Sequence, residues 1–94
     1  MNRDEIIRKT NLILQLCMNI NNMASDKRPT IFFEFSGHVD LVDVRVIKDG
    51  WKRNEKNNKE EFRVFIDTED AEKELNEIIV YLKELKEKLE EEDE

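Results

Sequence analysis

The sequence predicts a two-layer α+β domain with the element order α-β-β-β-α, and three observations carry this prediction. Residues 68–90 place apolar side chains at steps of three and four, which is the spacing of one helix face. Residues 2–24 hold a second, broader apolar arc at helical spacing. Between them, residues 30–35, 39–47 and 60–67 alternate apolar and polar side chains, as strands of a half-buried sheet do. We therefore expect a three-stranded antiparallel meander that is covered on one face by two helices.

Length and composition set the class of protein. Ninety-four residues form one domain, 1–94, because two shorter pieces would each be too small for a core. Apolar residues make up 38% of the chain and stand in patterned runs, which argues against disorder. No secretory segment and no apolar run of about 18 residues is present, so we expect no membrane association. The single Cys17 cannot form an internal disulfide, which favours a reducing, intracellular setting.

The first helix, expected at residues 2–24, has an unusually wide apolar side. Asp4 and Glu5 suit the positive end of its dipole, and Pro29 follows its end and starts an extended segment. An arc this wide predicts a helix that is buried on two sides, against the sheet and against the other helix. The residues of the arc are Ile6, Ile7, Ile13, Leu14, Leu16, Cys17, Ile20 and Met23.

The three strands divide their side chains between two faces. Gly37 allows a turn between the first two strands, and Asp49-Gly50 ends the second. The face expected to lie under the helices holds Ile31, Phe33, Phe35, Val42, Val44, Val46, Phe62, Val64 and Ile66. The opposite face carries Phe32 and Phe65, and it would be a natural interface if these two rings lie together.

The last helix has a narrow apolar seam with coiled-coil spacing. Asp67 or Thr68 can cap its start, and the acidic tail 91–94 is expected to fray. Its 22 residues from 68 to 89 span about 33 Å, more than three short strands can cover. The turns around Leu85 and Leu89 would then be bare, so the sequence predicts a homodimer through this seam. The seam residues are Leu75, Ile78, Leu82, Leu85 and Leu89, with Ala71 at its start.

Charge is distributed unevenly along the chain. Residues 67–94 hold 13 acidic residues against four lysines, a balance of −9, and residues 1–66 hold 10 acidic and 12 basic residues, a balance of +2; together they give −7. An acidic helix repels nucleic acid and favours a basic protein surface, although a solvated helix also carries charge without any partner. The candidate protein-binding residues are Glu69, Asp70, Glu72, Glu77, Glu84 and Glu87.

A basic loop provides an alternative binding site. Lysines and an arginine beside an aromatic residue are typical of sites for single-stranded nucleic acid. The bland interpretation is that the lysines are solvated and that the aromatic side chain folds back over the sheet edge. The residues concerned are Trp51, Lys52, Arg53, Lys56 and Lys59.

The sequence offers little that could carry catalysis. It contains no C-x-x-C, H-E-x-x-H, G-x-S-x-G or glycine-rich phosphate motif. His38 is the only histidine and is expected in a turn, and Cys17 is expected to be a small buried apolar residue. We therefore expect neither an enzyme nor a metal or cofactor site.

The segment FEFSGHVDLVDVRVIKDGW, residues 33–51, resembles small proteins of bacteriophages and other bacterial mobile elements. Those proteins similarly combine an F-x-F-S-G-H-V hairpin, a G-W turn and an acidic C-terminal helix. The resemblance implies a phage-type accessory protein without known catalytic residues. The leading functional hypothesis is therefore a non-enzymatic accessory protein that binds a host or phage protein. Small acidic phage proteins often inhibit host factors, so the resemblance also suggests inhibition of a DNA-handling or defence enzyme through the acidic helix. A nucleic-acid-binding module and a structural homo-oligomer are the alternatives.

Overall fold

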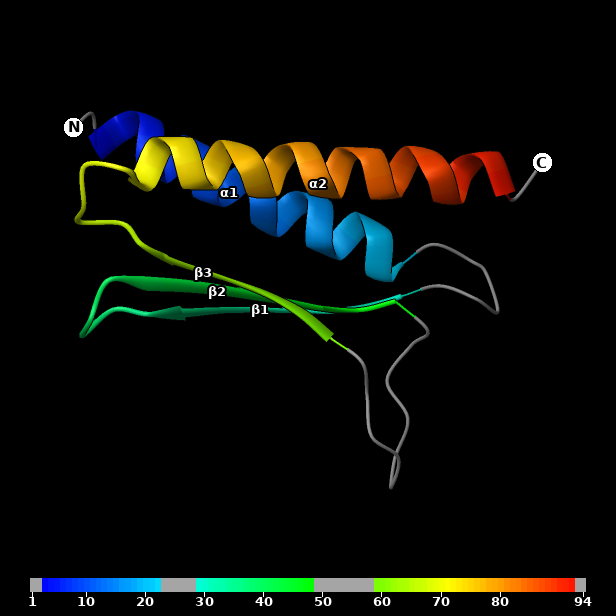
Figure 1. Ribbon diagram of the computed structural model, residues 1–94, viewed down its shortest axis with the longest axis horizontal. Helices are drawn as coiled ribbons and strands as arrows, with labels where there is room; N and C mark the ends of the chain where they lie inside the picture. Colours follow the sequence, from blue (N-terminus) through cyan, green and yellow to red (C-terminus); the bar gives the residue numbers. More distant parts are fainter. Residues whose placement is uncertain (1–2, 23–28, 49–58, 93–94) are drawn as a thin grey trace, which may run out of the picture.

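The computed structural model describes residues 3–22, 29–48 and 59–92 of the 94-residue chain. Its element order, α-β-β-β-α, confirms the predicted α+β fold class (Figure 1). The elements are α1 (Arg3–Asn21), β1 (Thr30–Ser36), β2 (Leu41–Ile47), β3 (Lys59–Phe65) and α2 (Ala71–Glu92).

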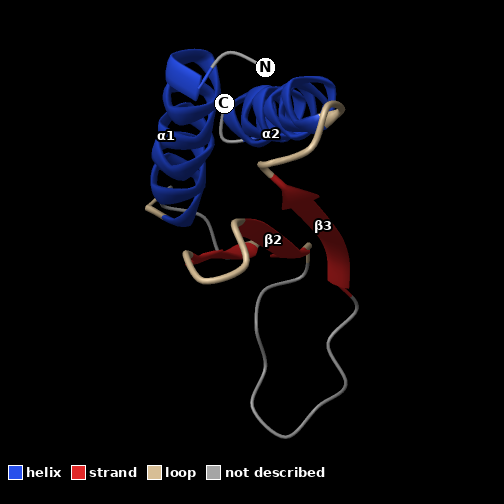
Figure 2. Cartoon of the chain, turned by 90° about the vertical axis from the view of Figure 1, so that its left-hand side faces the viewer, coloured by secondary structure: helices blue, strands red, loops and turns tan. Residues whose placement is uncertain are grey.

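The strands form one antiparallel sheet in the order β1-β2-β3, which makes β1 and β3 the two edges. Val44 in the centre of β2 lies opposite Phe33 of β1 and Phe62 of β3. Both helices lie on one face of this sheet, with the other face bare of helix (Figures 1 and 2). The predicted two-layer meander is therefore confirmed.

The core lies between the sheet and the two helices, which run side by side along it (Figure 1). Val42, Val44 and Val46 of the central strand are fully buried, as are Ile13 of α1 and Leu75 of α2. The valines lie beneath the helices because β2 alternates strictly and has a neighbour on each side. Burial of these side chains is the main favourable contribution to folding.

The seam of α2 is covered within a single chain. Leu75, Ile78 and Leu82 are almost completely buried, Leu89 is 7% exposed and Leu85 is partly buried against the core. The expectation that Leu85 and Leu89 lie bare is therefore wrong, and with it the stated reason for a dimer through this seam. The expectation compared α2 with the length of the strands alone, whereas α1 packs along α2 as well.

Uncovered apolar surface lies instead on α1. Ile6 and Ile13 are buried, but Ile7 is 49% exposed, Leu14 38% and Met18 56%. The prediction that the whole arc is buried is thus wrong for Ile7 and Leu14. One flank of α1 contacts α2, while on the other side the described chain has no element beyond the edge strand β1.

Several element boundaries differ from the predicted ones, and the largest differences are at the starts of β2 and α2 and at the end of β3, where turns occupy more residues. Residues 37–40 form the turn before β2, with Asp40 at a φ of 53°. The Thr68 hydroxyl donates to the carbonyl of Phe65 over 2.8 Å, so Thr68 closes a turn rather than capping α2. The helix begins only at Ala71 and continues through Glu92, so residues 91–92 of the tail expected to fray are helical.

Candidate protein-binding surfaces

The acidic residues predicted to bind a partner extend from the turn before α2 along the helix. Glu69, Glu72 and Glu77 line one shallow hollow together with Lys73. Glu72 is only partly exposed, and its carboxylate lies 3.8 Å from the Lys9 ammonium of α1. Asp70 is exposed in the turn before α2, and Glu84 and Glu87 are exposed further along the helix. The predicted residues therefore share their surface with basic side chains of both helices.

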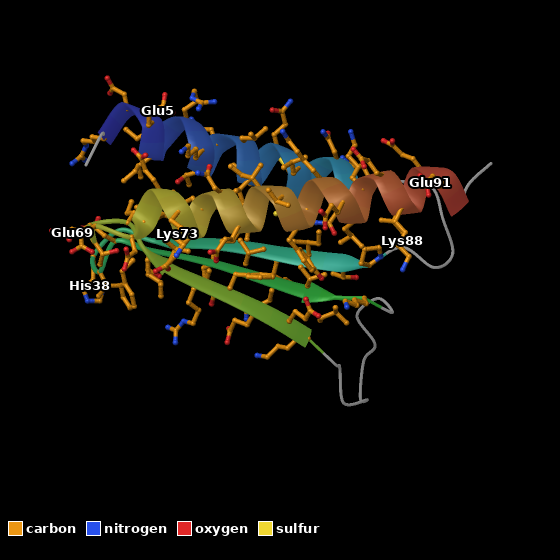
Figure 3. The ribbon with its side chains drawn as sticks, turned by 45° about the horizontal axis from the view of Figure 1, so that its top comes forward. Glu5, His38, Glu69, Lys73, Lys88 and Glu91 are labelled. Carbon is orange, nitrogen blue, oxygen red and sulfur yellow. The ribbon has the colours of Figure 1, made fainter. Side chains whose placement is uncertain are left out.

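The outer side of α2 is mixed in charge. Lys73, Lys83 and Lys88 are exposed there between the glutamates, and Lys73 and Lys88 can be followed in Figure 3. Lys86 also forms an ion pair with Glu90 at 3.5 Å, one turn further along. Interspersed charges of both signs produce a weak net field, so this side is a poor candidate for selecting a basic partner.

A denser acidic group lies at the end of the molecule where α2 begins. The turn between β1 and β2 meets the connection between β3 and α2, because the Ile66 amide donates to the carbonyl of Asp40 over 2.8 Å. Figure 3 shows Glu69 at the same end as His38 of the first turn. We define the acidic end as the four exposed acidic residues of these two turns, Asp40, Asp67, Glu69 and Asp70.

Sequence reasoning found half of the acidic end. The sequence pattern places Asp67 at the end of the third strand or at the cap of the last helix, and Asp40 lies 27 positions before it in the chain. The register of the β2–β3 pair brings them together, since Leu41 lies opposite Phe65 and each aspartate adjoins that pair through its turn. The alternating patterns predict the two strands and their faces, but the register of pairing decides which residues of the two turns become neighbours.

The acidic end is suited to electrostatic attraction rather than to chemistry. Among the described residues, no group of three or more His, Cys, Asp or Glu side chains could hold a metal ion. The described residues also place none of the four carboxylates in a salt bridge. Four solvated carboxylates at one end attract positive charge, and their attraction is screened by salt over about 8–10 Å.

The outer sheet face does not bring Phe32 and Phe65 together. Phe32 lies in the row Phe32–Arg45–Glu61, whereas Phe65 lies two rows away beside Leu41. The two rings therefore stand at opposite corners, roughly 16 Å apart from strand spacing and rise. The condition for an aromatic interface on this face is therefore not met, and the space between the corners holds charged side chains.

The middle of this outer face holds neighbouring side chains of both charges. The Arg45 guanidinium lies 5.4 Å from the centre of the Phe32 ring, and it contacts the Glu34 carboxylate at 3.4 Å. Partial burial raises the pKa of Asp43 above its ordinary value, and the neighbouring Glu61 raises it further. The Oδ1 atom of Asp43 and the Nε atom of Arg45 are shielded without a hydrogen-bond partner among the described residues.

The basic loop falls mostly outside the described residues, which include none of Trp51, Lys52, Arg53 and Lys56. Lys59, the first residue of β3, is exposed. At the base of the loop, the Lys48 ammonium lies 3.0 Å from the carboxylate of Glu60. A nucleic-acid site at this loop stays a prediction.

The two residues with potential reactivity occupy different surroundings. Cys17 of α1 is buried in the core, and this burial raises the pKa of its thiol to about 12. A thiol with so high a pKa is a poor nucleophile at neutral pH. His38 is exposed in the turn between β1 and β2.

Sequence reasoning missed an apolar groove between α1 and the edge strand β1. The groove encloses about 260 Å³. It was missed because Ile7 and Leu14 were assigned to the buried arc and Phe33 and Phe35 to the buried sheet face. The side chains that line it include Ile6, Ile7, Leu14, Phe33, Phe35 and Ile66.

The chain matches no family model, and it has no significant match among curated proteins or solved structures. Neither described helix contains a stretch that is long and apolar enough to cross a membrane. The surfaces themselves therefore have to support a functional proposal.

Proposed function

We propose that this chain is a non-enzymatic protein that binds a basic surface of another protein through its acidic end. The observation that carries the proposal is the meeting of two turns, fixed by the Ile66–Asp40 hydrogen bond, which holds four exposed carboxylates together. Carboxylates held by a folded scaffold lose little conformational freedom when a partner binds, so their charge is available at small entropic cost.

The charge distribution supports a role in recognition and association rate. The chain has a net charge of −7, and an acidic protein attracts basic partners over several ångströms before contact. On the outer side of α2 three lysines lie between the glutamates. The two turns of the acidic end hold four carboxylates, with Arg3 of α1 in the same hollow as Asp40 and Asp67 and Lys73 in the same hollow as Glu69. The docking contact is therefore at the end of the molecule and not along the helix.

The sequence resemblance to phage-type proteins suggests the biological setting. It supports an accessory protein that acts in the bacterial cytoplasm and inhibits a host enzyme, with DNA-handling and defence enzymes as the leading targets. Such enzymes present basic surfaces to DNA, and a group of carboxylates can occupy them. This part of the proposal relies on analogy and adds no site residue.

A pair of matched variants tests the proposal. One variant carries Asp67→Asn, Glu69→Gln and Asp70→Asn at the acidic end. The control carries Glu84→Gln, Glu87→Gln and Glu91→Gln, which removes the same charge from the outer side of α2. Each variant and the wild type are immobilised, and the proteins captured from a bacterial lysate are quantified by mass spectrometry at about 50 mM and about 500 mM salt.

We expect the wild type and the control to capture the same lysate protein at low salt. The acidic-end variant should capture at least about tenfold less of it. High salt should weaken capture by the wild type, because the carboxylates are exposed. Equal capture by all three chains, or loss only in the control, would contradict the proposal.

A further inference from the structure

At one end of the edge strand β1, a side chain makes the hydrogen bonds that a neighbouring strand would make. The Asn21 amide nitrogen donates to the carbonyl of Ile31, and the Ile31 amide donates to the Asn21 Oδ1 atom, both over 2.8 Å. These are the two bonds that one residue of a neighbouring strand would make. They show that the backbone groups of Ile31 point away from β2.

The rest of the edge follows from alternation along the strand. Residues two apart direct their backbone N–H and C=O groups to the same side. Because the backbone N–H and C=O groups of Ile31 point away from β2, those of Phe33 and Phe35 do so too. Among the described hydrogen bonds, no side chain pairs with the backbone groups of Phe33 and Phe35 as Asn21 does with those of Ile31. The edge therefore offers two donors and two acceptors in strand geometry.

An apolar surface lies directly beside these backbone groups. Ile7, Leu14 and Met18 follow one side of α1 at spacings of seven and four residues. Ile7 and Leu14 line the groove together with the half-exposed ring of Phe35. With side chains of about 200 Å² each, their exposed fractions amount to on the order of 400 Å² of apolar surface. Together with the strand edge and its polar rim, this approaches the roughly 800 Å² per partner of a stable interface.

We infer that a second copy of this chain covers the α1–β1 groove. The two β1 strands pair antiparallel about a twofold axis, with Phe33 of each copy opposite Phe35 of the other. The product is a continuous six-stranded sheet in which the two exposed sides of α1 pack against each other. The pairing is isologous, because the same surface supplies the strand edge and the apolar contact on both sides.

A second copy fits this surface better than a free peptide does. Ordering a flexible strand costs more free energy per residue than one backbone hydrogen bond typically returns. Only two residues of β1 are open, so a peptide gains too few bonds to offset that cost. A folded copy arrives with its strand already ordered and with its own apolar side.

Charge also favours self-association at this surface over other surfaces. A chain with a net charge of −7 repels its own copy wherever acidic residues meet. The residues that line the groove are all uncharged, and α2 packs on the far side of α1. In the inferred pairing Glu34 faces Glu34 of the other copy, but each is already paired with its own Arg45.

Cysteine cross-linking tests the pairing directly. In the inferred register the two Glu34 positions form a non-hydrogen-bonded pair with Cα atoms about 4.5 Å apart, which is within the range of a disulfide. Glu34→Cys should therefore form a covalent dimer under mild oxidation. The control is Arg63→Cys, an exposed position on the same sheet face of the other edge strand. The native Cys17 is buried and does not compete.

Sedimentation equilibrium provides the second measurement. The wild type should be dimeric, Leu14→Lys should raise the dissociation constant at least about tenfold, and Val80→Lys on exposed α2 should leave it unchanged. A wild type that stays monomeric up to about 1 mM would overturn the inference and leave the groove to a different partner. Equal cross-linking of the two cysteine variants would also overturn it. The acidic end is not involved, so either result leaves the proposed function to its own test.

Discussion

The two edge strands of this sheet protect themselves by different means. β3 reads KEEFRVF and has four charged residues in seven, whereas β1 reads TIFFEFS and has one. Charged edge strands discourage pairing with other chains, because the charges would have to be desolvated or opposed. At β3 the outermost carbonyl, that of Phe65, also accepts hydrogen bonds from Thr68.

The difference shows which edge the chain leaves available. β1 is closed only at Ile31 by Asn21, and the apolar side of α1 continues past its open part. β3 carries charged side chains along its length and lies next to α2, whose apolar seam is buried within the molecule. An edge with few charges beside an uncovered helix side is a surface for association, whereas a charged edge beside a satisfied helix is not.

The largest expected effect separates the satisfied helix from the uncovered one. Leu82→Ala removes a fully buried side chain and should lower the free energy of unfolding by about 2–5 kcal/mol. Leu14→Ala removes a half-exposed one and should cost less than about 1 kcal/mol in the isolated chain. Urea denaturation near 1 µM protein measures both. Similar costs would mean that the two helices are equally buried.

The next effect concerns the closed end of β1. Asn21→Ala leaves both backbone groups of Ile31 without their partners and should cost about 1–3 kcal/mol. Asn19→Ala, an exposed position on the same helix, is the matched control and should cost less than about 0.5 kcal/mol. The same denaturation assay applies. An equal cost for the two variants would show that Asn21 does not hold the edge.

Removing the charges of β3 should make the two edges alike. Glu61→Val with Arg63→Val leaves the net charge unchanged and replaces two exposed charged side chains by β-branched apolar ones. We expect the double variant to associate at concentrations where the wild type scatters no additional light, because its edge resembles an aggregation-prone strand. Static light scattering over a concentration series measures this. If scattering stays at the wild-type level, charge is not what blocks β3.

The smallest effect is on the pKa of Asp43 in the central strand, which charged residues of the two edge strands shift in opposite directions. Burial and the nearby Glu61 raise the pKa of Asp43, Arg45 and Arg63 lower it, and Glu34 raises it. Arg63→Gln should therefore raise this pKa further, and Glu34→Gln should lower it. A carboxyl-detected NMR titration of Asp43 measures both shifts. Shifts in the same direction would contradict this assignment of the neighbours.

The raised pKa of Asp43 also has a consequence for stability. Because the folded chain binds this proton more tightly than the unfolded chain does, stability falls as pH rises from the ordinary value of 3.8 through the raised one. Asp43→Asn should remove this loss and stabilise the chain at neutral pH by less than about 1 kcal/mol, since the group is only partly buried. A variant that is destabilised at pH 7 would show that the charged carboxylate is needed there.

The sequence was sufficient for the architecture because its patterns are local. Alternation in β2 and the spacing of Leu75, Ile78 and Leu82 each determine a face within one element. Turn chemistry was less readable: the turn before β2 takes in Val39, and Thr68 serves the turn after β3 instead of capping α2. Both errors concern a few residues at an element boundary.

The candidate surfaces were harder to predict because they depend on relations between elements. Whether Leu14 or Leu89 is covered depends on how the two helices are placed over the sheet relative to each other. The apolar spacing within one helix does not predict this placement. Asp40 and Asp67 meet only through the register of two strands. Asn21 holds Ile31 across a ten-residue separation, for which the sequence pattern gave no signal.

The packing of the first helix against the last has a consequence for how the chain is made. During synthesis the apolar side of α1 that packs against α2 stays uncovered until α2 has been made, because the three strands lie between the two helices in the chain. Nascent chains are most prone to associate with one another during this interval, and chaperones can bind α1 then.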